Sequence, residues 1–463
     1  MNPSPDKQNA ASATIDRWPY FWLGCTLIAI KYNLDRFIAW RWFDRSWYFW
    51  NYLQPHEIAL VDTVPPHDAT FYLALLVTSL PFLAAGLFLT LRRLRSAGLP
   101  LGLCLLFVVP VINLAFFIVL CLVPGQSSEK PIPSPDTRWW RPRSAVGSAL
   151  MAIVLVGLAG AGLSCFSTEV LQAYGSALFV ALPFVMGLVS VLIYGAGPKP
   201  PTVGNCLLVA VLPVFFCGLC LLACAAEGAI CLIMAAPIAL LLALMGGAVG
   251  YVIVGRRGAP VPPVAMLTLL LSVPLTMGME QQADEDAPLL CVTSSVVIHA
   301  SPERVWPNVV TFSPIPEARD WILHTGVAYP TRARIDGEGV GAVRHCIFTT
   351  GEFVEPIEVW DAPHLLRFSV AAQPEPMEEL SPYPHLRTPH LHGCLQSREG
   401  ELRLTNLAGG DTLLTGTTWY TDRIWPGRYW QIWSDLVIHH IHLRVLNHIK
   451  ELSEQSVGEA NSR

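Results

Sequence analysis

The sequence predicts a multi-helix transmembrane bundle of about eight spans, followed by a C-terminal α+β domain. Three observations lead to this fold class. Hydrophobic residues make up 52% of the 463 residues and charged residues only 14%, well below the roughly 25% that is typical of soluble domains. Long apolar runs fill residues 1–280, whereas short β-rich runs follow residue 285. A bilayer is therefore the expected solvent of the first part.

Eight segments are long and apolar enough to be expected as membrane spans. A helix needs about 20 apolar residues to cross a hydrocarbon core about 30 Å thick. A polar linker, 126–143, separates a three-helix block, 1–125, from an apolar five-helix block, 144–280. The segments lie approximately at 19–40, 70–91, 99–123, 144–163, 172–195, 205–225, 228–254 and 262–280.

The three-helix block carries the charged side chains that are expected to form a polar site in or near the membrane. Lys31 and Asp35 are four residues apart, with Arg36 adjacent, so the first two share a helical face and can form an ion pair. Arg92 and Arg93 make a basic loop that can contact anionic headgroups. The alternatives are a frayed helix end whose side chains reach the headgroups and a loop that only orients the spans.

The five-helix block is nearly free of ionisable side chains. Those present, such as Glu169, Glu227 and Glu280, fall near expected helix ends. Carriers coupled to ions normally place ionisable groups at mid-membrane depth. A secondary transporter is therefore disfavoured, and the bundle is expected to act as an anchor.

Residues 289–455 are expected to form the second domain. Runs such as CVTSSVVIHA and EFVEPIEVW are separated by Gly, Pro and Asp, which is typical of strands joined by turns. A short helix is expected to open at Ser301, and a long helix at about 429–453 closes the domain. This order of elements predicts that the closing helix covers one face of a sheet.

The sequence disfavours nucleic-acid binding and metal chemistry. A net charge of −5 provides no basic surface for phosphates, and no disulfide or zinc spacing of cysteines is present. Asp435, His439 and His442 share one face of the closing helix and are a possible metal triad, but a solvated helix face is the preferred interpretation. No cofactor, metal or nucleic acid is expected, and catalytic motifs are absent.

Three runs of the second domain resemble the SRPBCC, or START-like, superfamily of polyketide cyclases, aromatases and lipid-transfer domains. They are VVIHASPERVW (296–306), GVGAVRHCIFTTGEFVEPIEVWDAPHLLRFSV (339–370) and TGTTWY (415–420) before the closing helix. The resemblance implies a helix-grip fold, in which an antiparallel sheet surrounds a long C-terminal helix and a cavity. Members of the superfamily mostly bind apolar molecules, and some catalyse reactions on them.

Part of the aromatic surplus of this domain is expected to line an apolar pocket, because ligand pockets are mostly apolar with few polar groups. His440 is the polar candidate, since an imidazole beside a cavity can act as acid or base near neutral pH; a satisfied core histidine is the alternative. The residues expected to bind the ligand are Trp306, Trp321, Phe348, Phe368, Trp419, Trp433 and His440.

The first block is similar to a bacterial inner-membrane family classed as domain of unknown function 805. The similar runs are YFWLGCTLIAIKYNLDRF (20–37) and LTLRRLRSAGLPLGLCLLFVVPVINLAFFIVLCLVPG (89–125). In that family Arg-Arg-Leu is usually followed by His-Asp, whereas Arg95 and Ser96 follow here. The resemblance implies a multi-pass protein of the inner membrane, and the departure weakens any role for a His-Asp pair.

Three functional hypotheses follow from these features. The leading one is a membrane protein whose tethered START-like domain binds a lipid or other hydrophobic small molecule. The second is a cyclase or dehydratase acting on an apolar substrate, which two polar groups converging in a cavity would favour. The third is a structural or assembly role, which a domain without a cavity would favour. Unpaired thiols favour a cytoplasmic domain, whereas the Lys and Arg distribution favours the outside; the oligomeric state stays open.

Overall fold

The chain divides into two compact units in the computed structural model. The first unit comprises Met1–Leu221 and Ala235–Asp284, and the second comprises Leu222–Met234 and Glu285–Arg463. The second unit therefore includes the connection between two helices of the bundle. The structure describes residues 14–49, 52, 66–99, 101–108, 112–123, 144–198, 200–256, 261–281, 287–316, 320–383, 386, 388–391 and 393–461.

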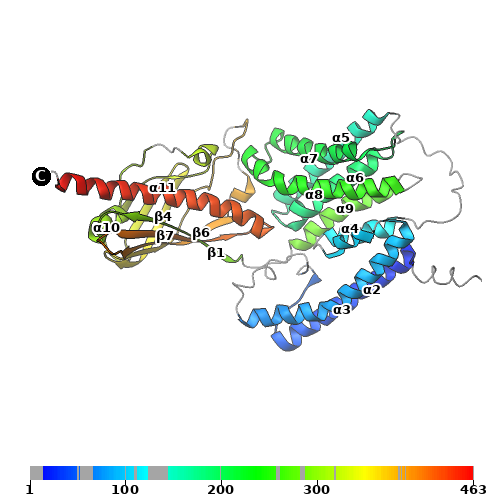
Figure 1. The fold of residues 1–463 in the computed structure, drawn as a ribbon, viewed down its shortest axis with the longest axis horizontal. Coiled ribbons are helices and arrows are strands. Elements are labelled where there is room, and N and C mark those ends of the chain that lie inside the picture. Colours follow the sequence, from blue (N-terminus) through cyan, green and yellow to red (C-terminus); the bar gives the residue numbers. More distant parts are fainter. Residues whose placement is uncertain are drawn as a thin grey trace, which may run out of the picture. The chain divides into compact units, whose positions relative to one another are not determined.

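Helices dominate the described part of the first unit, from α2 to α9 in Figure 1. The segment that is expected to span at 99–123 forms two shorter elements, and the sequence has Pro110 between them, a residue that interrupts helical hydrogen bonding. The elements are α2 (Arg17–Phe43), α3 (Pro66–Ala97), η2 (Leu101–Val108), α4 (Ile112–Leu122), α5 (Ala145–Cys165), η4 (Phe166–Val170), η5 (Ala177–Ala181), α6 (Leu182–Tyr194), α7 (Val203–Ala223), α8 (Ala229–Arg256) and α9 (Pro263–Glu280).

Six helices among the described residues are long and apolar enough to cross a membrane, so the expected count of eight is not confirmed. The helix α2 is not among the six, because Lys31, Asn33 and Asp35 interrupt its apolar sequence. The six segments are Thr70–Ala97, Ala145–Val170, Ala177–Tyr194, Val203–Ala223, Ala229–Arg256 and Pro263–Glu280.

Glycines allow α6 and α8 to pack closely in the first unit. A Cβ atom added at Gly187 would lie 2.0 Å from the carbonyl oxygen of Ala243, and one added at Gly246 would lie 2.0 Å from that of Phe184. Small residues at such crossings let helix backbones approach each other in a membrane. Every residue of α6 is buried, so this helix forms the centre of the five-helix block.

A seven-stranded antiparallel sheet and a long closing helix form the second unit, which confirms the expected α+β fold. The strand order is β1-β7-β6-β5-β4-β3-β2. The strands are β1 (Leu289–Ile298), β2 (Pro330–Asp336), β3 (Val343–Phe348), β4 (Gly351–Asp361), β5 (Leu365–Ser369), β6 (Leu395–Asn406) and β7 (Thr412–Asp422). The helices are α10 (Pro302–Val310), η6 (Trp321–Thr325), η7 (Pro389–Leu391) and α11 (Gly427–Asn461).

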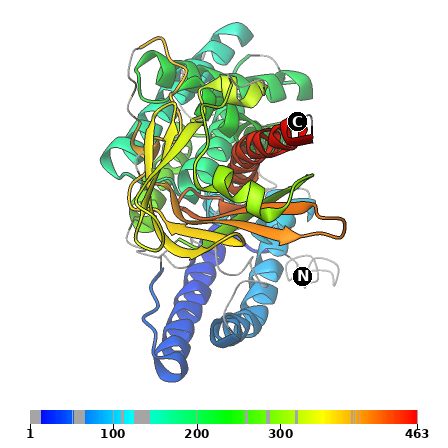
Figure 2. The ribbon, with the colours of Figure 1, turned by 90° about the vertical axis from the view of Figure 1, so that its left-hand side faces the viewer.

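The helix α11 lies along one face of the sheet, as Figures 1 and 2 show from two directions. Alternate strand residues point to this face, where Ile298, Leu366 and Leu414 join Leu446 and Ile449 of α11 in a buried core. The register shifts in β4 and β6, which are irregularities of the bulge type. Bulges bend strands, so that the sheet can curve around the helix.

Candidate functional site

A cavity of about 140 Å³ lies between the inner face of the sheet and α11. Strands β3 to β7 supply most of its wall, and α11 closes it. Its apolar lining includes Phe348, Phe353, Phe368, Leu402, Ile438 and Leu446.

A buried ion pair between Arg344 and Glu355 forms the most polar part of this wall. The two residues face each other across the β3–β4 hairpin, and their side chains are only 3% and 7% exposed. The Arg344 guanidinium donates to Glu355 Oε2 through Nη1 and lies 5.4 Å from the centre of the Phe368 ring. Burial raises the pKa of Glu355, and the attraction of Arg344 opposes this shift.

One donor of Arg344 is left unused inside the protein. The Nε–H group is buried and has no hydrogen-bond partner among the described residues. An unsatisfied buried donor costs about 1–3 kcal/mol. A ligand whose acceptor atom reached this group would remove this cost.

His442 of α11 is the second polar group in the cavity wall. Its Nδ1 lies 3.1 Å from Ser294 Oγ, and its Nε2 lies 2.8 Å from Thr418 Oγ1. Burial, together with the neighbouring His439, lowers the pKa of His442 to about 4. The imidazole is therefore neutral at pH 7, with both nitrogens next to hydroxyl groups.

Part of the helical face that carries His442 packs against the sheet, whereas His439 on the same face is exposed, as the sequence suggests. The Tyr420 hydroxyl donates to Asp435 Oδ1 at 2.6 Å, and Ser294 Oγ lies 2.7 Å from His439 Nδ1. Hydroxyl residues on β1 and β7 make this arrangement possible, because they supply hydrogen-bond partners for a polar helix face. Asp435 thus contacts Tyr420, whereas His439 and His442 share Ser294 Oγ.

The structure brings only two of the expected ligand-binding residues to the cavity, Phe348 and Phe368. Trp306 packs edge-on against Trp360, with ring centres 5.7 Å apart. His440 Nδ1 lies 3.7 Å from Asp320 Oδ2. Neither Trp306, Trp433 nor His440 is among the residues that line the cavity, and the side chain of Trp321 lies outside the described part of the chain.

Trp419 shows how register decides which aromatic residues reach the cavity. Thr418 and Tyr420 of β7 face α11, so the alternation of a strand directs Trp419 to the opposite face. There it packs under the Arg367 guanidinium, 5.2 Å from the ring centre.

Arg344, Glu355 and His442 line the cavity but are not among the residues that the sequence predicts to bind a ligand. Arg344, Cys346 and Phe348 alternate along β3, and this period of two places them on one face. Phe348 pairs with Gly351 across a two-residue turn. Locating that turn in the sequence would have paired Arg344 with Glu355.

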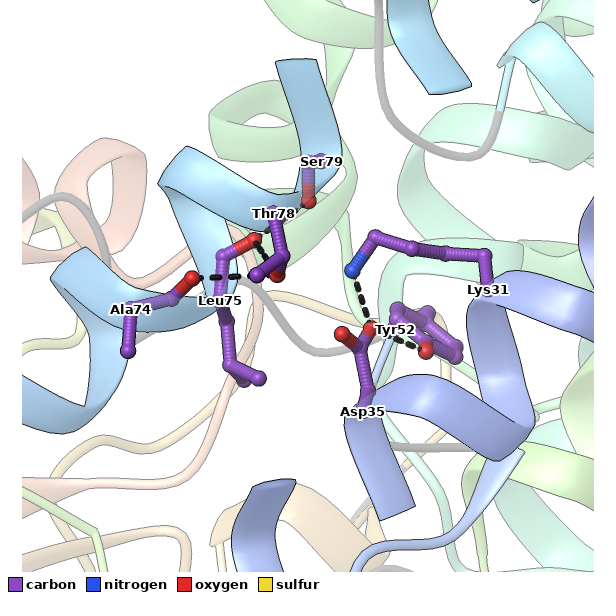
Figure 3. Close-up of polar contacts among 7 residues, drawn as sticks. All are labelled: Lys31, Asp35, Tyr52, Ala74, Leu75, Thr78 and Ser79. Carbon is purple, nitrogen blue, oxygen red and sulfur yellow. Dashed lines mark hydrogen bonds and ion pairs between the residues drawn. The ribbon is translucent and has the colours of Figure 1, made fainter. Parts of the chain in front are cut away.

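The expected polar site of the first block contains a buried ion pair with a hydrogen-bonded tyrosine (Figure 3). Lys31 donates to Asp35 Oδ2, and the Tyr52 hydroxyl donates to the same oxygen at 2.5 Å. Asp35 is fully buried, and its Oδ1 has no hydrogen-bond partner among the described residues. Figure 3 also shows Thr78, whose hydroxyl donates to the carbonyl oxygens of Ala74 and Leu75 in its own helix, α3. Arg36 is exposed and stands outside this network.

Arg93 is buried and binds backbone groups rather than headgroups. Its Nε donates to the carbonyl oxygen of Leu120 at 2.9 Å, Nη2 donates to that of Val123, and Nη1 donates to Ser96 Oγ at 3.1 Å. These carbonyls lie at the C-terminal end of α4, where a cation compensates unpaired acceptors. Arg92 is half-buried and donates to the carbonyl oxygen of Thr14 at 3.0 Å.

One group of side chains in the second unit has metal-binding donors close together. Donor atoms of Glu227, Cys231 and His390 lie within 4.8 Å of one another. No spacing motif predicts a metal here, because Cys231 and His390 are separated by 159 positions.

Comparisons with known proteins do not assign the chain to a family. No family model matches it, and no curated protein matches it. Among solved structures, part of the chain is similar to a point mutant of norcoclaurine synthase from Thalictrum flavum in complex with a transition-state analogue. The two are 12% identical with a TM-score of 0.25, and the match covers 37% of this chain and 99% of that one. A protein from Nitrosospira multiformis is 17% identical with a TM-score of 0.23, covering 35% and 94%. The protein XoxI from Bacillus cereus is 15% identical with a TM-score of 0.22, covering 35% and 93%. TM-scores this low say nothing about ligand or activity, and both family resemblances of the sequence remain expectations.

Proposed function

We propose that the second unit binds a compact, mainly apolar molecule with a hydrogen-bond acceptor, and that the helical bundle anchors this unit in a membrane. The observation that carries the proposal is the unused Nε–H donor of Arg344 in the wall of a mainly apolar cavity. Six apolar helices support the membrane anchor. We further propose the bacterial inner membrane and a cytoplasmic second unit.

The size of the cavity narrows the class of ligand. Drug-sized ligands occupy pockets of roughly 300–1,000 Å³, whereas an apolar cavity of roughly 150 Å³ accepts a molecule as small as benzene. A volume of about 140 Å³ therefore favours a single ring or a short chain over a whole phospholipid. A longer lipid would fit only if α11 moved away from the sheet.

The test uses the full chain, purified in detergent and studied by native mass spectrometry and by solvent extraction of bound molecules. We expect a small apolar molecule with a carbonyl, carboxyl or ether group. Repeatedly empty extracts, together with no saturable binding of one-ring carbonyl compounds, would contradict the proposal. Recovery of intact phospholipid at one per chain would refute the size limit.

An enzyme of the cyclase or dehydratase type is the second candidate, and His442 favours it. A neutral imidazole can accept a proton from a bound substrate, and a carboxyl group, Glu355, faces the same cavity. The His442→Gln substitution separates the two candidates. If the chain only binds its ligand, neither the native chain nor the His442→Gln variant converts the ligand. If the chain is an enzyme, the native chain converts the extracted molecule, and the His442→Gln variant binds it without converting it.

A further inference from the structure

A second cluster of reactive side chains lies away from the cavity but within the second unit. Glu227 precedes α8, Cys231 lies in the first turn of α8, and His390 lies in η7. The Cys231 Sγ atom is 3.0 Å from His390 Nε2, and His390 Nδ1 is 3.5 Å from Glu227 Oε2. Three segments that are distant in sequence therefore bring a thiol, an imidazole and a carboxylate together.

A second carboxyl group, that of Glu379, is buried against this cluster. Glu379 is 8% exposed, and a Cβ atom added at Gly228 would lie 2.0 Å from its Oε2. The carboxyl group also interacts with the Cys231 thiol and with the backbone at Ile230. Glycine at position 228 leaves the space that this carboxyl group occupies.

The local charge favours a cation over a reactive cysteine. Glu227 and Glu379 both approach the Cys231 thiol, and two carboxylates beside a thiolate raise its energy unless a positive charge offsets them. The start of α8 and His390 both favour a thiolate at Cys231, but the two carboxylates oppose it, so a cation is needed to offset their charge. A divalent metal ion would offset most of this negative charge and would keep the thiol deprotonated.

We propose that Glu227, Cys231 and His390 bind a zinc ion, with one ring nitrogen of His390 on the metal and with Glu379 or water at the fourth position. Thiolate, imidazole and carboxylate are the three protein ligands that zinc uses. Small movements of the side chains bring donors that lie within 4.8 Å of one another to bonding distance. The ion would fasten η7 to the start of α8 within the second unit.

The test measures zinc binding by the full chain in detergent, after removal of metal with a chelator. Zinc is titrated against a chromophoric competitor, and cobalt is used to detect thiolate-to-metal charge-transfer absorption. We expect one zinc ion per chain and a higher unfolding temperature with zinc, since a ligand that binds only the folded state stabilises it. The Cys231→Ser variant should lose more than about 100-fold in zinc affinity and should lack the thiolate band.

Cys224 provides the matched control, because it is an exposed cysteine in the same connection between helices. The Cys224→Ser variant should bind zinc and cobalt as the native chain does. A His390→Cys variant should retain zinc and strengthen the thiolate band, which keeps the test valid if removal of a donor impairs folding. The proposal is overturned if the native chain takes up no stoichiometric zinc, or if Cys231→Ser and His390→Ala bind zinc as the native chain does.

Discussion

Among the described residues, each unit contains one buried arginine, and the two arginines have different surroundings. Arg93 in the first unit binds carbonyls of α4 and the Ser96 hydroxyl. Arg344 in the second unit pairs with Glu355 and keeps an unused donor in the cavity wall. Burial is similar for both. A buried charge therefore indicates a ligand site when part of its hydrogen-bonding capacity is unused and its side chain lines a cavity.

The largest expected effect follows from removing the buried guanidinium of Arg344 while Glu355 is kept. The Arg344→Met variant should lose about 3–5 kcal/mol of unfolding free energy at pH 8, because Glu355 would be left as a buried unpaired charge. The measurement is thermal or denaturant unfolding of the full chain in detergent.

Replacing both partners separates stability from binding. The Arg344→Met/Glu355→Leu variant should recover most of the lost stability, since an apolar pair of similar size is often neutral or stabilising, yet it should not bind carbonyl ligands. If this double variant binds carbonyl ligands as the native chain does, Arg344 has no role in ligand recognition. Its role is then structural, like that of Arg93.

A pH dependence of stability should arise from His442 in the second unit. Its pKa is lowered from 6.5 to about 4 in the folded chain, so the unfolded chain binds more protons between these values. Stability from this group is complete above pH 6.5 and is lost as the pH falls towards 4, by up to about 3 kcal/mol.

The effect of His442 is measured as a difference between two proteins. Burial raises the pKa of Asp422 to about 6, and this acts in the opposite direction, because the folded chain then binds more protons as the pH falls. Subtracting the pH curve of His442→Gln from that of the native chain removes the contribution of Asp422. A difference that does not change between pH 7 and pH 4 would show that His442 is not a buried neutral imidazole.

In the first unit, the Arg93→Gln variant should lose about 1.5–3 kcal/mol, the usual contribution of hydrogen bonds to a charged group. Ligand binding by the second unit should not change. Arg95 is exposed in the same helix, and Arg95→Gln should change stability by less than about 0.5 kcal/mol. Equal effects of the two substitutions would mean that Arg93 does not cap α4.

The smallest expected effect is at Trp419. The Trp419→Ala variant removes a cation–π contact with Arg367 on the outer face of the sheet, which contributes about 0.5–1 kcal/mol at an exposed site. Ligand affinity should stay within a factor of two, whereas Phe368→Ala should reduce it strongly. A large loss of affinity for Trp419→Ala would place this residue at the ligand.

The class of each unit follows from the sequence, because hydrophobicity and strand alternation are local properties. Local patterns also predict the α10 start and the closing helix. The strand β2 gives only a weak signal in the sequence, because Arg332, Arg334 and Asp336 make it polar; it lies beside β3 at the edge of the sheet. The number of membrane spans is harder to predict. Whether α2 can lie in lipid depends on partners of its polar residues, such as Tyr52, which hydrogen-bonds Asp35.

The site depends on register and on contacts between distant segments, which composition does not reveal. Phe348 and Trp419 are both aromatic strand residues, yet only Phe348 lies on the inner face. His442 and His440 differ by two positions on α11, and only His442 contacts the sheet. The cluster at Cys231 requires three segments to meet, so no single stretch of sequence contains it.

If a small carbonyl compound binds in the cavity, a side chain that fills the cavity should abolish its binding. Gly416 lines the cavity, and a Cβ atom there would be no closer than 3.5 Å to its neighbours. The Gly416→Val variant should therefore fold and occupy the space of the ligand, whereas Thr415→Val changes the outer face of the same strand.

Binding of acetophenone and ethylbenzene to the full chain in detergent is measured by saturation-transfer NMR, with Gly416→Val as the background for partition into micelles. We predict that the native chain and Thr415→Val bind acetophenone more tightly than ethylbenzene, and that Gly416→Val binds neither above background. Equal signals from all three proteins would contradict the account.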